Sequence, residues 1–213
     1  MNNIILSIMI PVYNQEDLIL CSLESIPKRS DIELLIIDDN STDNTVIKIS
    51  NWINKNNKEF GNILFKKNKK NMGCGFGKNW AYTNAQGKFI ITIDSDDYVY
   101  TNKYNEVINK LYNLNADIIF IGNDVNNGEE WTGPSRKATW SYFIKNNFLK
   151  VNNLNYDPEA RRAGDFNLTT EIQQLQREEI ILKDIVYHYN YPRKGSIVWN
   201  YENGIDENLY RNN

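Results

Sequence analysis

Three carboxylates fall within four residues in Asp94-Ser95-Asp96-Asp97, directly after the apolar run 89–93. A buried strand that ends in carboxylates delivers them to the carboxyl edge of a sheet, where open α/β folds bind ligands. Clustered carboxylates repel one another by about 4 kcal/mol per close pair at an effective dielectric of about 20, unless a cation or hydrogen bonds compensate. Hard divalent cations prefer such oxygen ligands. The pattern therefore favours a metal held against phosphates over its alternative, a polar turn of self-capping aspartates.

Two further polar stretches follow apolar runs near the start of the chain, Pro11-Val12-Tyr13-Asn14 and residues 38–43. A nucleotide base needs a flat apolar neighbour and polar groups for its edge. Tyr13 can stack on such a base, and Asp39 can accept a hydrogen bond from a ring N–H. In the alternative interpretation Tyr13 ends a core strand and residues 38–43 only cap a helix.

Residues 71–79 contain three glycines and a lysine, Gly73, Gly75, Gly77 and Lys78, followed by Asn79. Glycines permit a close approach of the backbone, and Lys78 brings a positive charge to the start of a predicted helix. This combination suits a loop that folds over a diphosphate. Taken alone, the glycine pattern is more typical of a flexible surface loop.

Apolar runs and helical spacing alternate along the first half of the chain, which predicts an α/β fold. Four strands joined through helices favour a mainly parallel sheet, because parallel neighbours need crossover connections. We expect strands at residues 4–10, 32–37, 63–65, 88–93 and 117–121, and helices at residues 15–26, 43–52, 78–85 and 104–114.

The second half is less regular. Residues 123–133 are polar and turn-rich, which predicts a connection without regular structure. Helices are expected at residues 140–149 and 166–176 and a strand at 180–187, whereas the chain from Tyr189 onward has no clear period.

The composition is that of a globular protein. With 213 residues and 41% hydrophobic content, the chain fits one domain with a real core. A net charge of -3 gives no general attraction to nucleic acid or anionic lipid, and the lysines at 66–70 are interpreted as a solvated loop. No apolar run approaches the roughly 18 residues of a membrane span, and the start lacks the basic residues of a signal peptide, so a cytoplasmic location is expected. Cys21 and Cys74 fit neither a disulfide framework nor a zinc site.

The four stretches together resemble family 2 glycosyltransferases of the GT-A fold, nucleotide-diphospho-sugar transferases that usually invert the anomeric centre. They occur in the family order over about the first hundred residues. The resemblance implies a single GT-A (Rossmann-like) domain over residues 1–213, with a mainly parallel central sheet flanked by helices. Residues 1–100 would then form the nucleotide-sugar-binding half, and residues 101–213 a less regular acceptor-side half.

The resemblance also implies residue roles. Asp96 is the implied ligand of Mn²⁺ or Mg²⁺ and His188 a further ligand, although three neighbouring tyrosines make a packed or stacked histidine an equal alternative. Asp97 and Asn79 are implied to support the sugar or its loop. The implied donor-binding residues are Pro11, Tyr13, Asn14, Asp39, Gly73, Lys78, Asp94 and Ser95.

Inversion requires a base that takes the proton of the incoming hydroxyl, and Asp165 is the candidate. It lies roughly where relatives carry an acidic pair, but Gly164 replaces the first member of that pair. The alternative is a helix N-terminal carboxylate stabilised by the helix dipole. The fallback candidates for the base are Asp157, Glu159 and Glu171. The resemblance also implies that the tail residues Arg193, Lys194 and Ser196 lie near the diphosphate. Three tryptophans either line an acceptor pocket or pack in the core, and they are Trp131, Trp140 and Trp199.

The activity implied by the resemblance is metal-dependent, inverting transfer from a UDP-sugar to a hydroxyl of a glycan or other glycoconjugate, as in polysaccharide biosynthesis. A catalytically silent nucleotide-sugar or glycan-binding module is the main alternative. A nucleotidyltransferase is disfavoured, because it would open with a glycine-rich, basic loop after the first strand, whereas this chain has Pro11-Val12-Tyr13-Asn14. A nucleic acid acceptor finds no support in the acidic charge balance.

Overall fold

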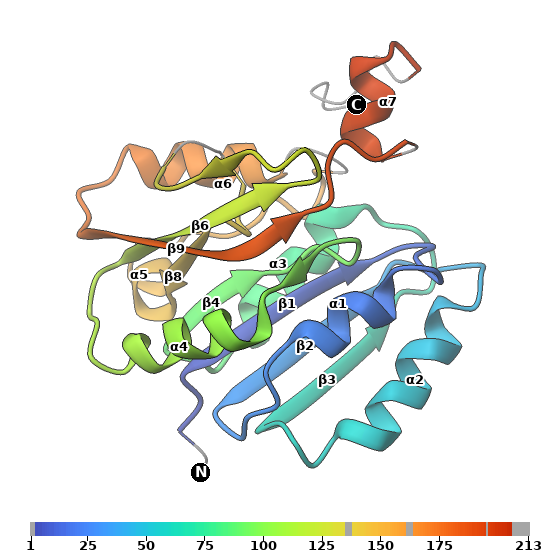
Figure 1. Ribbon diagram of the computed structural model, residues 1–213, viewed down its shortest axis with the longest axis horizontal. Coiled ribbons are helices and arrows are strands. Elements are labelled where there is room, and N and C mark those ends of the chain that lie inside the picture. The colour runs from blue at the N-terminus through green and yellow to red at the C-terminus, as the bar shows by residue number, and fades with distance from the viewer. Residues whose placement is uncertain (1–2, 135–137, 161–163, 195, 206–213) are drawn as a thin grey trace.

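One mixed β-sheet crosses the molecule and carries helices on both faces (Figure 1). The computed structural model describes residues 3–134, 138–160, 164–194 and 196–205. The strand order is β3-β2-β1-β4-β8-β6-β9-β5, and β7 pairs with β6. The strands are β1 Leu6–Val12, β2 Ile32–Asp38, β3 Asn62–Lys67, β4 Phe89–Thr92, β5 Tyr98–Val99, β6 Ile118–Val125, β7 Glu130–Trp131, β8 Tyr142–Lys145 and β9 Glu179–Tyr189.

The first four main strands form the parallel part of the sheet. β1 pairs in parallel with β2 on one side and β4 on the other, and Ile8 lies opposite Leu34 and Ile91. β2 continues the parallel ladder to β3. Strands β1, β2 and β4 are almost entirely buried, as expected for a parallel sheet covered on both faces. The predicted α/β class and its parallel strands are therefore confirmed, and polar residues gather at the carboxyl edge of this part.

Two apolar cores lie on opposite faces of the sheet. Helices α1, α2 and α4 contribute to the first core, and helices α3, α5 and α6 contribute to the second. Along β1, Ile8 and Ile10 belong to the first core and Met9 to the second, which follows from the two-residue period of a strand. The helices are α1 Ile19–Ser25, α2 Thr45–Asn56, α3 Cys74–Asn84, α4 Thr101–Leu111, α5 Asn146–Val151, α6 Gly164–Gln173 and α7 Ile197–Glu202.

The second half of the sheet differs from the sequence-based expectation in several places. The helix predicted at 140–149 is wrong in its first part: residues 142–145 form β8, antiparallel to both β4 and β6. Tyr142, Phe143 and Ile144 are all buried, and a short apolar run of this kind does not distinguish a buried strand from a buried helix. The polar connection at 123–133 is also more regular than predicted, because β6 extends to Val125 and β7 pairs with it. Helix α7 was not predicted.

The boundaries in the first half agree more closely. Helix α3 begins at Cys74, four residues before the predicted start, and follows Gly73, whose φ of 87° is a conformation that favours glycine. None of the described helices is long and apolar enough to cross a membrane. One sheet runs through both halves, and the assignment of a donor half and an acceptor half stays a prediction.

A buried carboxylate fixes the edge of the sheet opposite the acidic turn. Glu33 on β2 is fully buried, and its Oε1 accepts hydrogen bonds from Ser7 Oγ at 2.5 Å and from the backbone N–H groups of Gln86 at 2.5 Å and Gly87 at 3.1 Å. Through these bonds β2 holds both β1 and the turn between α3 and β4. One acidic side chain therefore links three segments at this edge of the sheet.

We predict that Glu33→Ala lowers the free energy of unfolding by roughly 3 kcal/mol, because it leaves the buried Ser7 hydroxyl and the Gln86 N–H without the acceptor they share. Urea denaturation of the two proteins measures the difference. Glu59→Ala, at an exposed position, is the matched control and should change stability by less than about 0.5 kcal/mol. Equal midpoints for the Glu33 and Glu59 variants would contradict the assigned role.

Candidate active site

The acidic turn after β4 presents two of its carboxylates and buries the third. Asp97 N–H donates to the carbonyl oxygen of Asp94 at 3.0 Å, which closes the turn. Asp94 and Asp96 are half-buried, whereas Ser95 and Asp97 are buried. The carboxylates of Asp94 and Asp96 are therefore the ones at the open side of the turn.

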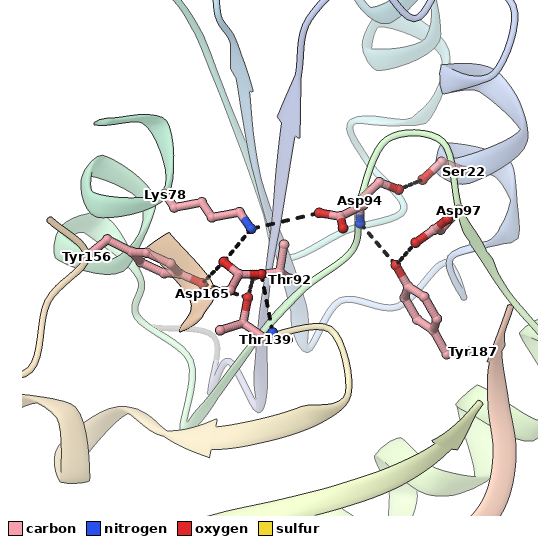
Figure 2. Close-up of polar contacts among 9 residues, drawn as sticks. All are labelled: Ser22, Lys78, Thr92, Asp94, Asp97, Thr139, Tyr156, Asp165 and Tyr187. Atoms are coloured by element: carbon pink, nitrogen blue, oxygen red, sulfur yellow. Dashed lines mark hydrogen bonds and ion pairs between the residues drawn. The ribbon is translucent and has the colours of Figure 1, made fainter. Parts of the chain in front are cut away.

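Asp97 anchors this turn to β9. Its Oδ2 accepts from the Tyr187 hydroxyl at 2.5 Å, and its Oδ1 accepts from the backbone N–H of Asn190 at 2.9 Å. The same Tyr187 hydroxyl accepts from the backbone N–H of Asp94 at 3.2 Å (Figure 2). Burial and the charges of the neighbouring aspartates raise the pKa of Asp97 well above its usual range. Of the roles predicted for Asp97, this placement fits support of the loop.

Lys78 lies between two carboxylates that are far apart in the sequence, as Figure 2 shows. Its Nζ is 2.7 Å from Asp165 Oδ1 and 3.9 Å from Asp94 Oδ1, and the lysine is only 5% exposed. Burial alone would lower the pKa of Lys78, but the two negative charges outweigh it and raise the pKa. The ammonium group is therefore firmly charged and joins α3, α6 and the acidic turn.

Asp165 sits in a dense set of hydrogen bonds at the start of α6. Its Oδ1 also accepts from the Tyr156 hydroxyl at 3.0 Å, and its Oδ2 accepts from the backbone N–H of Thr139 at 3.4 Å. Thr139 Oγ1 is in turn 3.0 Å from Thr92 Oγ1 on β4. Burial tends to raise the pKa of Asp165, but the charge of Lys78 and these hydrogen bonds outweigh burial and lower it.

The pKa of Asp94 is shifted in the opposite direction from the pKa of Asp165. Burial, followed by the negative charges of Asp165 and Asp96, raises the pKa of Asp94 to about 6, although Lys78 acts against this shift. Two carboxylates that share one lysine thus differ in proton affinity. Such a divergence is typical of acid–base and metal sites.

Asp39 organises the glycine loop. Its Oδ1 accepts from Asn68 Nδ2 at 2.9 Å and from Met72 N–H at 2.8 Å, and its Oδ2 accepts from Gly73 N–H at 2.8 Å. A carboxylate has about four acceptor positions, so these three bonds leave room for one further donor. Gly73, one of the predicted donor-binding residues, is thus brought next to Asp39.

The loops after β1 and β2 are tied together beside Tyr13. Asn14, at a φ of 49°, accepts from Thr42 N–H at 2.9 Å, and its own N–H donates to Ser41 Oγ at 2.9 Å. Pro11 lies within β1, opposite Ile37 of β2. The Tyr13 side chain is left 45% exposed, which suits a ring that stacks on a ligand.

The residues of the turn fit a hard divalent cation. Magnesium is usually bound through one or two carboxylates together with substrate phosphates, and Asp94 and Asp96 supply two half-buried carboxylates on one turn. Asp96 forms an ion pair with Arg193. Within the described residues, no group of three or more His, Cys, Asp or Glu side chains is placed to hold a metal by itself.

His188 lies on β9 with both ring nitrogens engaged. Nδ1 is 2.8 Å from Asp124 Oδ1 and Nε2 is 2.9 Å from Asn126 Oδ1, while the ring stacks on Tyr98. These contacts are the ones expected of the packed alternative, and the role of His188 as a metal ligand stays a prediction.

The remaining sequence candidates are distributed as follows. Trp140 is buried and stacks on Tyr187 with ring centroids 4.9 Å apart, as in the core alternative. All three fallback candidates for the catalytic base lie at exposed positions, namely Asp157, Glu159 and Glu171. Asn79 Oδ1 is a buried acceptor with no hydrogen-bond partner in the described part of the chain. Sequence reasoning missed Thr92, Thr139, Tyr156 and Tyr187, because a single threonine or tyrosine carries no motif.

A parallel half-sheet with charged side chains gathered at its carboxyl edge is the arrangement at which open α/β folds bind ligands. The chain belongs to glycosyl transferase family 2, whose family model matches residues 7–172. Family membership and the predicted GT-A fold are thereby confirmed.

The curated relatives are longer than this chain. It is 26% identical over 210 residues to the Staphylococcus aureus poly(ribitol-phosphate) beta-N-acetylglucosaminyltransferase TarS, a match that covers 89% of this chain and 36% of TarS. It is 30% identical over 151 residues to WfgD of Escherichia coli, a UDP-Glc:alpha-D-GlcNAc-diphosphoundecaprenol beta-1,3-glucosyltransferase, covering 68% of this chain and 57% of WfgD. The chain thus spans about a third of TarS and over half of WfgD.

Solved structures share the fold. S. aureus TarS 1-349 in complex with UDP-GlcNAc superposes with a TM-score of 0.77 at 22% identity, covering 91% of this chain and 60% of that one. The mannosyltransferase PcManGT from Pyrobaculum calidifontis, in complex with GDP-Man and Mn²⁺, gives a TM-score of 0.69 at 16% identity. The match covers 93% of this chain and 60% of PcManGT.

We predict that Lys78→Met lowers the free energy of unfolding by about 3 to 5 kcal/mol, because it leaves two carboxylates without their buried counter-charge. The double variant Lys78→Met/Asp165→Asn should lose clearly less than the sum of the two single variants. Denaturant unfolding of all four proteins completes the cycle. Strict additivity would show that the ion pair does not couple α3 to α6.

Proposed function

We propose that the protein is a metal-dependent, inverting glycosyltransferase that moves a hexose or hexosamine from a UDP-sugar to a hydroxyl of a glycoconjugate. The observation that carries this proposal is the convergence of Asp94 and Asp165 on Lys78. It brings the predicted base within one side chain of the acidic turn predicted to hold the metal and the donor. Membership of family 2 and the fold shared with a UDP-GlcNAc complex support it.

The relatives suggest the class of acceptor. TarS is named for poly(ribitol-phosphate) and WfgD for a diphosphoundecaprenol-linked sugar, so both acceptors are glycoconjugates that contain phosphate. We propose an acceptor of the same broad class, a hydroxyl on a teichoic acid or on a lipid-linked sugar. A role in polysaccharide biosynthesis follows from that proposal.

The residues at the sheet edge can divide the work as follows. Tyr13 stacks on the base, Asp39 accepts from its ring N–H with its remaining acceptor position, and the unpaired Asn79 Oδ1 accepts from a hydroxyl of the donor sugar. Asp94 and Asp96 would hold Mn²⁺ or Mg²⁺. When bound, the metal neutralises charge on the leaving diphosphate.

Asp165 would take the proton of the acceptor hydroxyl as that oxygen attacks the anomeric carbon. Its lowered pKa makes it a weak base while Lys78 is its partner. A diphosphate beside Asp94 would compete for the charge of Lys78 and so raise the pKa of Asp165 toward the range that suits a general base. Donor binding would in this way strengthen the base.

A catalytically silent nucleotide-sugar-binding module is the second candidate, and the lowered pKa of Asp165 favours it. The two candidates differ in turnover and not in donor binding. To separate the two candidates, the protein is incubated with Mn²⁺, a panel of UDP-sugars and phosphate-containing glycan acceptors. Released UDP and glycosylated acceptor are then measured, and only the enzyme should produce them.

We expect Asp165→Asn to keep donor binding and to lower turnover by about 10²- to 10⁴-fold, the usual contribution of a general base. Calorimetric titration with UDP-sugar and a UDP-release assay measure the two quantities. Asp157→Asn is the control, since Asp157 is exposed and an asparagine can still accept from Glu159 N–H. Undiminished transfer by the Asp165 variant would remove its assignment as the base.

We expect Asp96→Ala to abolish the part of UDP-sugar binding that depends on Mn²⁺, because only Asp94 would remain at the open side of the turn. Donor titrations with Mn²⁺ and with a chelator, on both proteins, measure that part. The wild-type protein should bind more tightly with the metal and the variant equally with or without it. A variant that still responds to Mn²⁺ like the wild type would rule out Asp96 as a ligand.

A further inference from the structure

The segment after β9, residues 190–193, lies against the acidic turn. Asn190 N–H donates to Asp97 Oδ1 at 2.9 Å, and Asn190 Nδ2 donates to the carbonyl oxygen of Asp96 at 3.1 Å. Three residues later Arg193 pairs with the carboxylate of Asp96. The Arg193 Nε is buried and has no hydrogen-bond partner within the described residues. The segment therefore brings a guanidinium group, on a side chain that is 26% exposed, to the turn that faces the proposed diphosphate.

One residue on the opposite side holds this segment in place. Asn126, in the turn between β6 and β7, donates through its backbone N–H to Tyr191 O at 3.0 Å. Its side-chain Nδ2 donates to Asn190 Oδ1 at 3.0 Å and to Pro192 O at 3.2 Å. Three hydrogen bonds from a single asparagine thus fix the backbone and side chain of the residues that precede Arg193.

His188 sets the orientation of the Asn126 amide. Pro192 O can only accept, so the amide nitrogen must face it, and the amide oxygen faces His188 Nε2 at 2.9 Å. On the other side of the ring, His188 Nδ1 faces Asp124 Oδ1 at 2.8 Å. Asp124 and Asn126 thus occupy both ring nitrogens, and neither is left open to a metal in this arrangement.

Aromatic and charged neighbours fix the ring itself. His188 stacks on Tyr98 with centroids 4.4 Å apart and an interplanar angle of 18°. Tyr100 packs edge-on against the same ring, and its hydroxyl donates to Asp124 Oδ2 at 2.6 Å. Rotation of the imidazole would break these contacts together, so the ring is a rigid support for Asn126.

We propose that Asp124, His188 and Asn126 form a positioning relay that holds residues 190–193 and so presents Arg193 to the diphosphate of the donor. A guanidinium held ready loses less conformational entropy on binding phosphate than a free side chain, and it can contact two oxygens at once. His188 acts through Asn126 and is a positioning residue. The inference rests on the proposed function for the identity of the ligand.

The test compares Asn126→Asp with Asn127→Asp. The first substitution keeps a side-chain oxygen that faces His188, but it removes both side-chain N–H donors to the segment and places a charge beside Pro192 O. Asn127 is exposed, and its Oδ1 accepts only a local bond from Glu129 N–H, which aspartate preserves, so the control carries the same charge one residue away.

We expect Asn126→Asp to weaken binding of UDP and of a UDP-sugar, measured by calorimetry with Mn²⁺, by about 10- to 100-fold, the range typical of groups that orient a ligand's direct partners. Hydrogen exchange of residues 189–194 should be faster in this variant, with an unchanged thermal midpoint. Asn127→Asp should match the wild type in all three measurements. Equal nucleotide affinity of the two variants would overturn the relay.

A second variant separates positioning from metal ligation. His188→Gln should leave Mn²⁺ binding to the nucleotide-free protein unchanged, as measured by electron paramagnetic resonance, and should weaken UDP binding as Asn126→Asp does. Loss of Mn²⁺ binding would overturn the positioning role and identify His188 as a ligand. If the wild-type protein binds no nucleotide sugar at all, the proposed function fails. The relay is then tested by hydrogen exchange alone, and it is overturned if residues 189–194 exchange equally fast in the two asparagine variants.

Discussion

The site depends on one buried ammonium group shared by two carboxylates. Lys78 comes from α3, Asp94 from the turn after β4 and Asp165 from α6, so a single cation fixes three elements that approach from different parts of the chain. A charge this deeply buried is tolerated only where it is paired and hydrogen-bonded, and here removal of Lys78 would leave both carboxylates without their counter-charge. Lys78 consequently fixes the positions of α3 and of the start of α6 relative to the acidic turn. Asp39 in turn binds the glycine loop that precedes α3.

The second half of the chain supplies most of the supports. Tyr187 on β9 bonds to both ends of the acidic turn, and its ring stacks on Trp140, which is buried beside β8. Thr139 connects Asp165 to Thr92 at the end of β4. The mixed part of the sheet therefore orients carboxylates that the parallel part carries. Rigid, hydrogen-bonded supports of this kind are what preorganise a site, because the groups that act on a substrate are then not free to relax away from it.

Much of the polar edge of the parallel strands was predictable from the sequence, because strands that are buried on both faces leave uninterrupted apolar runs and the polar residues after them must reach one edge. Asp94 and Asp39 were found in this way. The pairing of Lys78 with Asp165 spans 87 residues and leaves no periodic or spacing signal. Thr139 and Tyr156 were missed for the same reason. Strand β8 was misassigned because its short apolar run fits a buried helix equally well.

The glycine before Asp165 has a physical explanation in the packing around it. A Cβ at position 164 would lie 3.3 Å from Cδ1 of Tyr156, closer than an ordinary contact, so a larger residue would push against this ring. The Tyr156 hydroxyl contacts both Asp165 Oδ1 and Thr139 Oγ1, at 3.0 and 2.6 Å. An acidic residue at 164, the first member of the pair described above, would require the Tyr156 ring to shift by a few tenths of an ångström, and with it the hydroxyl that stabilises the neighbouring carboxylate. Gly164 therefore leaves room for the Tyr156 ring, and the Tyr156 hydroxyl in turn donates a hydrogen bond to the Asp165 carboxylate.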